Sequence, residues 1–132
     1  MKILICDAAP VLLAAIEFRL RKHGLEMLQV TNQTLSNAIA EESPKLIIFD
    51  IEESPAASLR LIQATKNNGA KAIPLIVISP IETEEILWQA LQMGVEDFVI
   101  KPFKPIELVV RVRRLLNTLG NNTHQEKDIF QL

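Results

Sequence analysis

The stretch Lys45-Leu46-Ile47-Ile48-Phe49-Asp50 decides the fold of this chain. Its four consecutive apolar residues predict a strand buried on both faces, as in the centre of a parallel sheet. The stretch ends on a carboxylate, Asp50. In an open parallel α/β sheet, the carboxyl ends of the strands border the crevice where ligands bind. We therefore expect Asp50 to lie at a functional edge, although an acid here also suits a solvated loop or a helix cap.

Apolar stretches and helical patterns alternate along the rest of the chain. Four more strands are predicted at 3–6, 27–30, 75–78 and 98–100. Helices are predicted at 10–23, from the cap Thr34 to a break at Ser43-Pro44, and at about 56–68, 82–93 and 105–119. The first helix carries its apolar stripe on Val11, Leu12, Ala15, Ile16 and Leu20. Five strands alternating with five helices predict an α/β fold with helices on both faces of a parallel sheet. We favour the flavodoxin-like order 2-1-3-4-5, although the other doubly wound order also fits.

Length and composition indicate one ordinary globular domain. The chain has 132 residues, of which 48% are hydrophobic and 23% charged. A net charge of −2 argues against broad nucleic-acid binding, and no apolar run approaches the length of a membrane span. The single cysteine, Cys6, cannot form an internal disulfide, which favours a cytoplasmic protein. We expect one domain over residues 1–119 and a mobile tail or truncated linker over 120–132.

Four polar side chains follow the predicted strands: Asp7, Asp50, Ser79 and Lys101. The ends of neighbouring parallel strands lie about 5 Å apart, so we expect these groups to meet at one edge of the sheet. Carboxylates supply oxygen ligands for a hard cation, and an ammonium and a hydroxyl can hold phosphoryl oxygens. A flavin- or nucleotide-binding enzyme on the same architecture is a remote alternative, because the loop after Asp7 lacks the glycine-rich amides that cradle a phosphate.

Four motifs follow one another in the chain. They are KILICD at 2–7 with Pro10 after it, LIIFD at 46–50, PLIVIS at 74–79, and GVEDFVIKPF at 94–103. Together they resemble the CheY-like receiver domains of two-component response regulators over essentially residues 2–117. The resemblance implies that Asp50 accepts a phosphoryl group from a histidine kinase or phosphotransfer protein, with Mg²⁺ bound. It assigns phosphoryl binding to Ser79 and Lys101, and switching to Ser79 and Phe98. The output would be a downstream effector protein or a missing effector domain, and the only catalysis would be the chain's own phosphorylation and dephosphorylation.

The chain departs from this family in its acidic pocket. The family carries an acid pair after the first strand, whereas here Asp7 is followed by Ala8, at the position of the principal metal ligand. The expected metal ligands are then Asp7, Asp50 and the backbone carbonyl of Glu52, whose side chain is a further candidate. Because Mg²⁺ demands near-ideal octahedral oxygen coordination, we expect weak or absent metal binding. The alternative function is a pseudo-receiver, a protein–protein docking module that needs neither metal nor phosphate.

The last helix resembles that of OmpR/PhoB-type receivers, which dimerise through their last two helices. Asp97, Glu107 and Arg111 match the charged residues of that interface. However, no lysine or arginine occurs at 72–100, so the fourth helix lacks the basic partner that such dimers use. The charges therefore suit either a homodimer or a solvated face. Trp88 of the fourth helix fits either a half-buried core position or an interface anchor.

Overall fold

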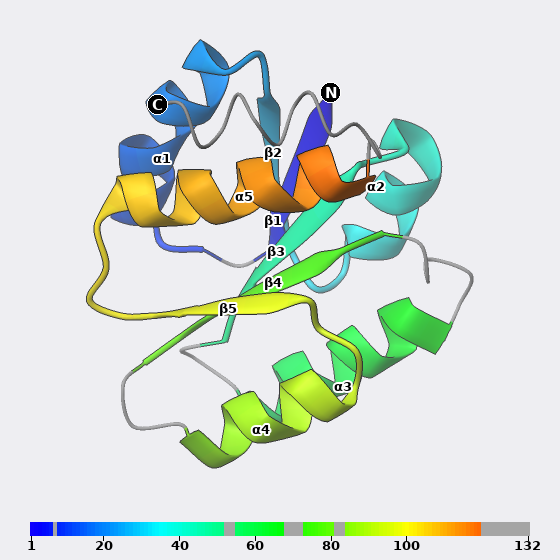
Figure 1. Cartoon of the computed structure of the whole chain (residues 1–132). Helices are drawn as coiled ribbons and strands as arrows, with labels where there is room; N and C mark the ends of the chain where they lie inside the picture. Colours follow the sequence, from blue (N-terminus) through cyan, green and yellow to red (C-terminus); the bar gives the residue numbers. More distant parts are fainter. Residues whose placement is uncertain (7, 52–54, 68–72, 81–83, 120–132) are drawn as a thin grey trace.

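A parallel sheet with helices on both faces forms the molecule (Figure 1). The computed structural model describes residues 1–6, 8–51, 55–67, 73–80 and 84–119, so the tail expected at 120–132 lies outside the described residues. The strands are β1 (Lys2–Cys6), β2 (Glu26–Val30), β3 (Leu46–Asp50), β4 (Leu75–Ser79) and β5 (Asp97–Ile100). The helices are α1 (Pro10–Lys22), α2 (Leu35–Glu42), α3 (Pro55–Asn67), α4 (Glu84–Gln92) and α5 (Pro105–Leu119). All strand pairs are parallel in the order β2-β1-β3-β4-β5, which confirms the predicted fold and strand order.

Strand β3 lies at the centre of the sheet, hydrogen-bonded to β1 on one side and β4 on the other. All five of its residues are buried. Alternate side chains enter different cores: Ile48 packs on the side of α1, whereas Ile47 and Phe49 pack on the opposite side. Both faces of β3 are thus covered, which explains its uninterrupted apolar sequence.

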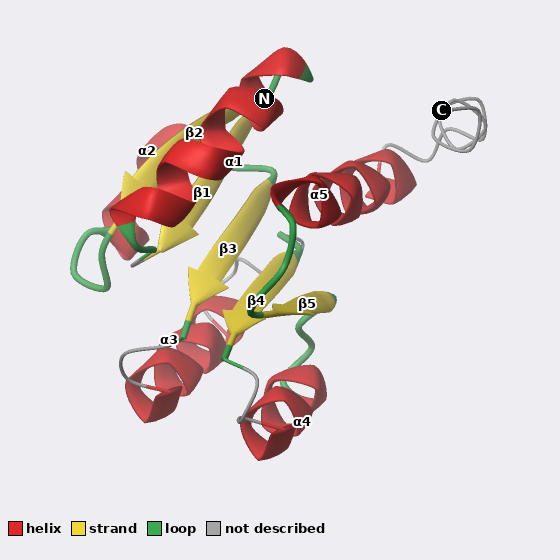
Figure 2. Cartoon of the chain, turned by 90° about the vertical axis from the view of Figure 1, so that its left-hand side faces the viewer, coloured by secondary structure: helices red, strands yellow, loops and turns green. Residues whose placement is uncertain are grey.

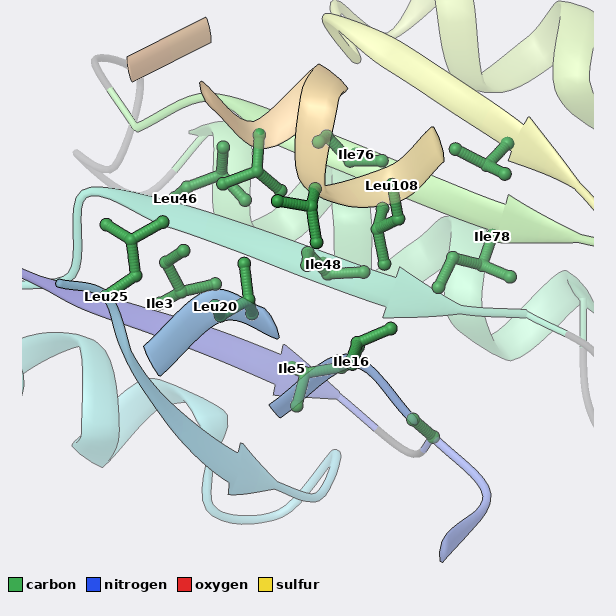
Figure 3. Close-up of a cluster of buried hydrophobic side chains, with 14 of the residues drawn as sticks. Ile3, Ile5, Ile16, Leu20, Leu25, Leu46, Ile48, Ile76, Ile78 and Leu108 are labelled. Carbon is green, nitrogen blue, oxygen red and sulfur yellow. The ribbon is translucent and has the colours of Figure 1, made fainter. Parts of the chain in front are cut away.

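Helices α1 and α5 cover one face of the sheet. Figure 3 shows Ile5 of β1, Ile48 of β3 and Ile78 of β4 beside Ile16 of α1 and Leu108 of α5. These side chains are completely buried, and each buried aliphatic side chain contributes about 1.5–3 kcal/mol relative to an exposed one. This layer holds the carboxyl ends of the central strands in a fixed arrangement.

Helices α2, α3 and α4 cover the other face. Leu35 of α2, Ile62 of α3 and Leu87 of α4 pack against Phe49 and Val77 of the sheet. Figure 2 shows α3 and α4 at the bottom, across the sheet from α1 and α5. The two layers bury the central strands on both faces, whereas the edge strand β2 keeps several exposed side chains.

The ends of the helices follow the predicted boundaries closely, with one wrong capping assignment. Gly24 and Gly94, with φ of 74° and 95°, follow α1 and α4. Thr34 stands at the start of α2 but makes no side-chain capping bond; its hydroxyl instead accepts a hydrogen bond from the Thr31 amide at 2.9 Å. A threonine hydroxyl can bond either to a backbone amide in a turn or to an amide in the first turn of a helix. Here the Thr34 hydroxyl bonds to the amide of the preceding turn.

The predicted apolar stripe of α1 is partly wrong. Ile16 and Leu20 are buried, but Val11 is 82% exposed and Ala15 is also exposed, while Leu13 takes the inward position near the start of the helix. Apolar residues occur on both sides of this short helix, so their spacing alone did not identify the buried face. Within the described part of the chain, no helix combines the length and apolar character that a membrane span requires.

Candidate functional site

Asp50 and Lys101 meet at the carboxyl edge of the sheet. The Lys101 ammonium donates a hydrogen bond to Oδ2 of Asp50 at 3.0 Å. The Asp50 side chain is only 3% exposed, whereas that of Lys101 is 24% exposed. The carboxylate is therefore enclosed, and its cation lies between it and solvent. Two of the residues that the sequence analysis placed in one site are in direct contact.

Backbone hydrogen bonds beyond the strand ends position this pair. The amide of Ile51 donates to the carbonyl of Ile78 at 3.0 Å, which extends the β3–β4 pairing past Asp50. The amide of Lys101 donates to the carbonyl of Ser79 at 2.8 Å, which extends the β4–β5 pairing in the same way. The peptide bond between Lys101 and Pro102 is cis. The ends of β3, β4 and β5 are thus tied together where their polar side chains begin.

Ser79 lies at the same edge but its hydroxyl has a local acceptor. Its side chain is completely buried, and Oγ donates to the carbonyl oxygen of Pro80 at 3.1 Å. To donate instead to a group attached to Asp50, the hydroxyl would have to leave this acceptor by rotation about χ1. Phe98 of β5 is half-buried and packs with the α3 and α4 side of the sheet.

The Asp50–Lys101 pair sets the electrostatics of the site. Removing a carboxylate from water carries a large desolvation cost, which a paired ammonium at hydrogen-bond distance offsets. The pair leaves a carboxylate oxygen nucleophile beside a cation that can follow negative charge as it develops on an incoming group. Chemically, this arrangement suits the binding or covalent attachment of an anionic group such as phosphoryl.

The described residues do not by themselves fit a Mg²⁺ ion. Asp7 and Glu52, two of the expected ligands, lie outside the described residues. Ala8 is buried, and its methyl group belongs to the apolar cluster beneath α1 and α5. Searched over the described chain alone, no group of three acidic, histidine or cysteine side chains gathers around a possible metal position. Since Mg²⁺ requires about six oxygen ligands in octahedral geometry, Asp50 alone is an insufficient donor set.

The charged residues matched to a dimer interface are arranged differently within one chain. Nη1 of Arg111 on α5 donates to both carboxylate oxygens of Asp97 on β5, at 2.8 and 3.0 Å. Glu107 is exposed on α5, and Trp88 is 63% exposed on α4. The core interpretation of Trp88 is therefore wrong. A pairing of Arg111 with Asp97 of a second copy would have to replace the bond within the chain.

Sequence reasoning missed two apolar residues next to Trp88. Leu91 and Ile100 are both exposed and line a groove between α4 and β5 together with Trp88 and Phe98. The spacing does contain this information: Leu91 follows Trp88 by three residues and shares its helix face, and Ile100 follows Phe98 by two and shares its side of the strand. The spacing shows which residues share a face, but it does not identify the face that carries Trp88 and Leu91 as the exposed one.

Comparison with known protein sequences agrees with this geometry. The family model of the response regulator receiver domain matches residues 3–113. The phosphate regulon transcriptional regulatory protein PhoB of Pseudomonas aeruginosa is 30% identical over 120 residues, which cover 89% of this chain and 52% of PhoB. A probable transcriptional regulator, ycf27 of Cyanophora paradoxa, is 28% identical over 123 residues, covering 92% of this chain and 51% of that protein. The chain thus spans about half the length of these relatives.

Solved structures resemble the whole sheet and its helices. The receiver domain of TorR, the response regulator of the TMAO respiratory system, has a TM-score of 0.81 and 26% identity, and the match covers 89% of this chain and 98% of TorR's. The receiver domain of NtrX from Brucella abortus has a TM-score of 0.77 and 26% identity, with 88% and 98% covered. These similarities extend over nearly the full length of each receiver domain.

Proposed function

Because this chain belongs to the receiver-domain family of two-component response regulators, we propose that Asp50 accepts a phosphoryl group and that its phosphorylation switches a partner-binding surface. The observation that carries the proposal is the contact between the enclosed Asp50 carboxylate and the Lys101 ammonium at the carboxyl edge of the sheet. We take residues 1–119 as the receiver unit. Its catalysis would be limited to its own phosphorylation and dephosphorylation, and its place would be the cytoplasm.

The proposed transfer uses the residues at the strand ends. A carboxylate oxygen of Asp50 attacks the phosphorus of a phosphohistidine on a kinase or phosphotransfer protein. The P–N bond breaks, its electron pair stays on the imidazole nitrogen, and an acyl phosphate forms on Asp50. Lys101 then transfers its hydrogen bond from the carboxylate to a phosphoryl oxygen, and the Ser79 hydroxyl turns from Pro80 to another. These two rearrangements would link phosphorylation to β4 and β5, and through Phe98 to the surface next to α4.

We expect Asp7, Asp50 and Glu52 to be the ligands of Mg²⁺ and to hold the ion only weakly. A bound Mg²⁺ would supply positive charge for the phosphoryl oxygens. The buried methyl group of Ala8 contributes no oxygen, and the loss of even an outer-shell partner typically lowers metal affinity about 10–100-fold. Lys101 is then the principal cation that the described residues offer to a transferring phosphoryl group.

The exposed side of α1 is the surface we propose for the phosphodonor protein. Val11 and Phe18 are 82% and 60% exposed, and they lie on the helix that starts next to the strand ends. The Lys22 ammonium lies 4.7 Å from the centre of the Phe18 ring, which favours an exposed ring through a cation–π contact. Apolar side chains left in water at this position suit a protein partner, and no direct contact with nucleic acid is proposed.

Labelling from a small-molecule phosphodonor such as acetyl phosphate tests the proposal. Wild type should acquire an acyl phosphate slowly, and Asp50→Asn should acquire none. Ala8→Asp should increase Mg²⁺-dependent labelling about tenfold or more, because it supplies the missing carboxylate ligand. Ala9→Asp, one residue further along, is the matched control for added charge and should change labelling little. Equal labelling of wild type and Asp50→Asn would refute the acceptor role.

The pseudo-receiver remains a second candidate function, and the burial of Ala8 in the apolar core favours it. In that case the fold is kept for partner contacts alone. Beryllofluoride, which mimics a phosphoryl group on a carboxylate, distinguishes the two functions. Binding of beryllofluoride at Asp50 with Mg²⁺ present supports the phosphorylated switch. Its absence at millimolar Mg²⁺, in a protein that still binds its partner, supports the pseudo-receiver.

A further inference from the structure

Basic side chains gather where the end of α1 meets α5. Arg19 and Lys22 of α1 and His23 directly after it are exposed, and their three- and four-residue spacing places them on one side of the helix. The guanidinium of Arg113 on α5 donates a hydrogen bond to Nδ1 of His23, so the two helices are joined at this point. These four side chains form what we call the basic surface.

The acids of the described chain do not neutralise the basic surface. Helices α1 and α5 each carry three basic residues and one glutamate, although the whole chain has a net charge of −2. The glutamate of α1, Glu17, is already bound to Arg21. Among the described residues, neither Arg19 nor Lys22 forms an ion pair with an acid, and the hydrogen-bond partner of Arg113 is a histidine.

The stability of the helices explains only part of this arrangement. Basic residues in the last turn of a helix interact favourably with its dipole, which accounts for Arg19 and Lys22. The effect falls off within one turn, and α5 has no basic residue in its last turn. Arg113 lies further back in α5 and contacts His23 instead of an acid. Basic residues from two helices thus converge without a structural need for them, which indicates an anionic ligand.

The basic surface lies toward the edge of the sheet opposite Asp50. Shortly after α1, the amide of Glu26 donates to the carbonyl of Met1 at 2.9 Å, next to the start of β1. Asp50 is the last residue of β3, which runs parallel to β1. A ligand on the basic surface would therefore leave the proposed phosphorylation site free, and its binding would not depend on phosphorylation of Asp50.

Nucleic acid and a second copy of the chain are poorer ligands than an acidic peptide. Tight binding to a duplex backbone uses about 6–10 phosphate contacts, more than this surface provides in a chain of negative net charge. In a two-fold contact the basic surface would meet itself, with like charges opposed. A short run of carboxylates matches the few basic groups, and arginine can bind a carboxylate through two parallel hydrogen bonds.

We propose that the basic surface binds an acidic segment of a partner protein. Two carboxylates of that segment would accept hydrogen bonds from the guanidinium groups of Arg19 and Arg113. A third would pair with the ammonium of Lys22, which lies 4.7 Å from the centre of the Phe18 ring and belongs to an exposed side chain. Exposed ion pairs are individually weak, so binding requires several acids close together in the segment.

Fluorescence anisotropy of labelled peptides tests the proposal on the unphosphorylated full chain. The probes are two synthetic ten-residue peptides that differ only in five positions, which are glutamate in one and glutamine in the other. The glutamate peptide should bind with a dissociation constant on the order of 100 µM at low ionic strength. The glutamine peptide should bind about tenfold more weakly or less. Raising the ionic strength to about 0.5 M should remove most of this difference.

Charge variants locate the binding. Arg19→Gln with Lys22→Gln should weaken binding of the glutamate peptide about fivefold or more, because two ion pairs are lost. Arg60→Gln with Lys45→Gln removes the same two residue types at exposed positions on α3 and before β3, and should leave the affinity within twofold. Arg113→Gln should weaken binding about threefold. Circular dichroism checks that each variant is folded.

Three results would overturn the proposal. Equal affinities for the glutamate and glutamine peptides would mean that the carboxylates are not recognised. Equal losses in the Arg19/Lys22 and Arg60/Lys45 variants would mean an effect of net charge alone. Tighter binding of a short DNA duplex than of the glutamate peptide, with the loss of both in the Arg19/Lys22 variant, would assign the basic surface to nucleic acid.

Discussion

At the scale of single residues, the contact between Asp50 and Lys101 explains how the two side chains are held at the site and which chemistry we propose for them. The carboxylate is more enclosed than the amine, so the amine is the partner that can move when the carboxylate acquires a new group. Lys101 has a long, flexible side chain and a compact charge, which suits transfer between two neighbouring acceptors. In the unphosphorylated protein, we expect the Lys101 ammonium to contribute to the free energy of unfolding.

Replacement of Lys101 by methionine should therefore destabilise the fold. The substitution preserves the length of the side chain but leaves the enclosed Asp50 carboxylate without its ammonium. We expect the free energy of unfolding in urea to fall by about 2 kcal/mol. Lys104→Met, on an exposed neighbour in the same loop, should change it by less than about 0.5 kcal/mol. Equal effects of the two variants would show that the ion pair contributes nothing to stability.

At the scale of secondary-structure elements, Glu96 joins three of them at the edge opposite the site. Its carboxylate accepts a hydrogen bond from the Leu75 amide at 2.8 Å and from the Lys66 ammonium at 3.0 Å. The Lys66 side chain belongs to α3, Leu75 begins β4, and Glu96 precedes β5. The contact thus fixes the amino ends of β4 and β5 relative to α3.

Truncation of Glu96 should loosen this connection. Glu96→Ala leaves the amide of the buried Leu75 without its side-chain acceptor and should lower the free energy of unfolding by about 1–2 kcal/mol. Glu96→Gln keeps an acceptor oxygen and should lose less. Glu41→Ala, on the exposed side of α2, serves as the control with little expected change. An effect of Glu96→Gln as large as that of Glu96→Ala would assign the stabilisation to charge instead of the amide bond.

The end of α4 depends on the backbone conformation of Gly94. Its φ of 95° is unfavourable for residues with a Cβ atom, and a Cβ built there would meet nothing closer than 3.9 Å. The cost of a substitution is therefore conformational and not steric. We expect Gly94→Ala to lower the free energy of unfolding by about 1 kcal/mol and Gly94→Asn by less, measured in urea. A larger loss in Gly94→Asn than in Gly94→Ala would contradict this explanation.

At the scale of the whole molecule, the edge with the proposed chemistry lies apart from two surfaces with exposed apolar side chains. The strand ends carry Asp50 and Lys101, the outer side of α1 carries Val11 and Phe18, and the groove of α4 and β5 carries Trp88. Because Arg111 is already bound to Asp97 within its own chain, we expect the protein to sediment as a monomer at micromolar concentrations. Reversal of charge by Glu84→Lys with Glu85→Lys should increase self-association, since Glu107 of a second copy then has a basic partner. A wild-type dimer that these substitutions dissociate would contradict this expectation.

Much of this organisation could be predicted from residue patterns alone. The unbroken apolar runs, each with a polar residue at its end, predicted the sheet and the meeting of Asp50 with Lys101, because parallel strands end at one edge. Side-chain choices between near-equal partners could not be predicted. The Ser79 hydroxyl bonds to the neighbouring carbonyl, Thr34 stabilises a turn, and Arg111 folds back onto Asp97 within its own chain. Each depends on local geometry that residue spacing does not determine.

The central claim is that the Asp50 carboxylate receives the phosphoryl group, and reduction of the labelled protein with borohydride tests it most directly. Borohydride converts an acyl phosphate to an alcohol, so an aspartyl phosphate becomes homoserine, which mass spectrometry of the peptides locates. We predict homoserine at position 50 after treatment with a phosphodonor, and an unchanged aspartate there without the donor. The corresponding alcohol at another acidic residue, with Asp50 intact in a fully labelled sample, would contradict the account.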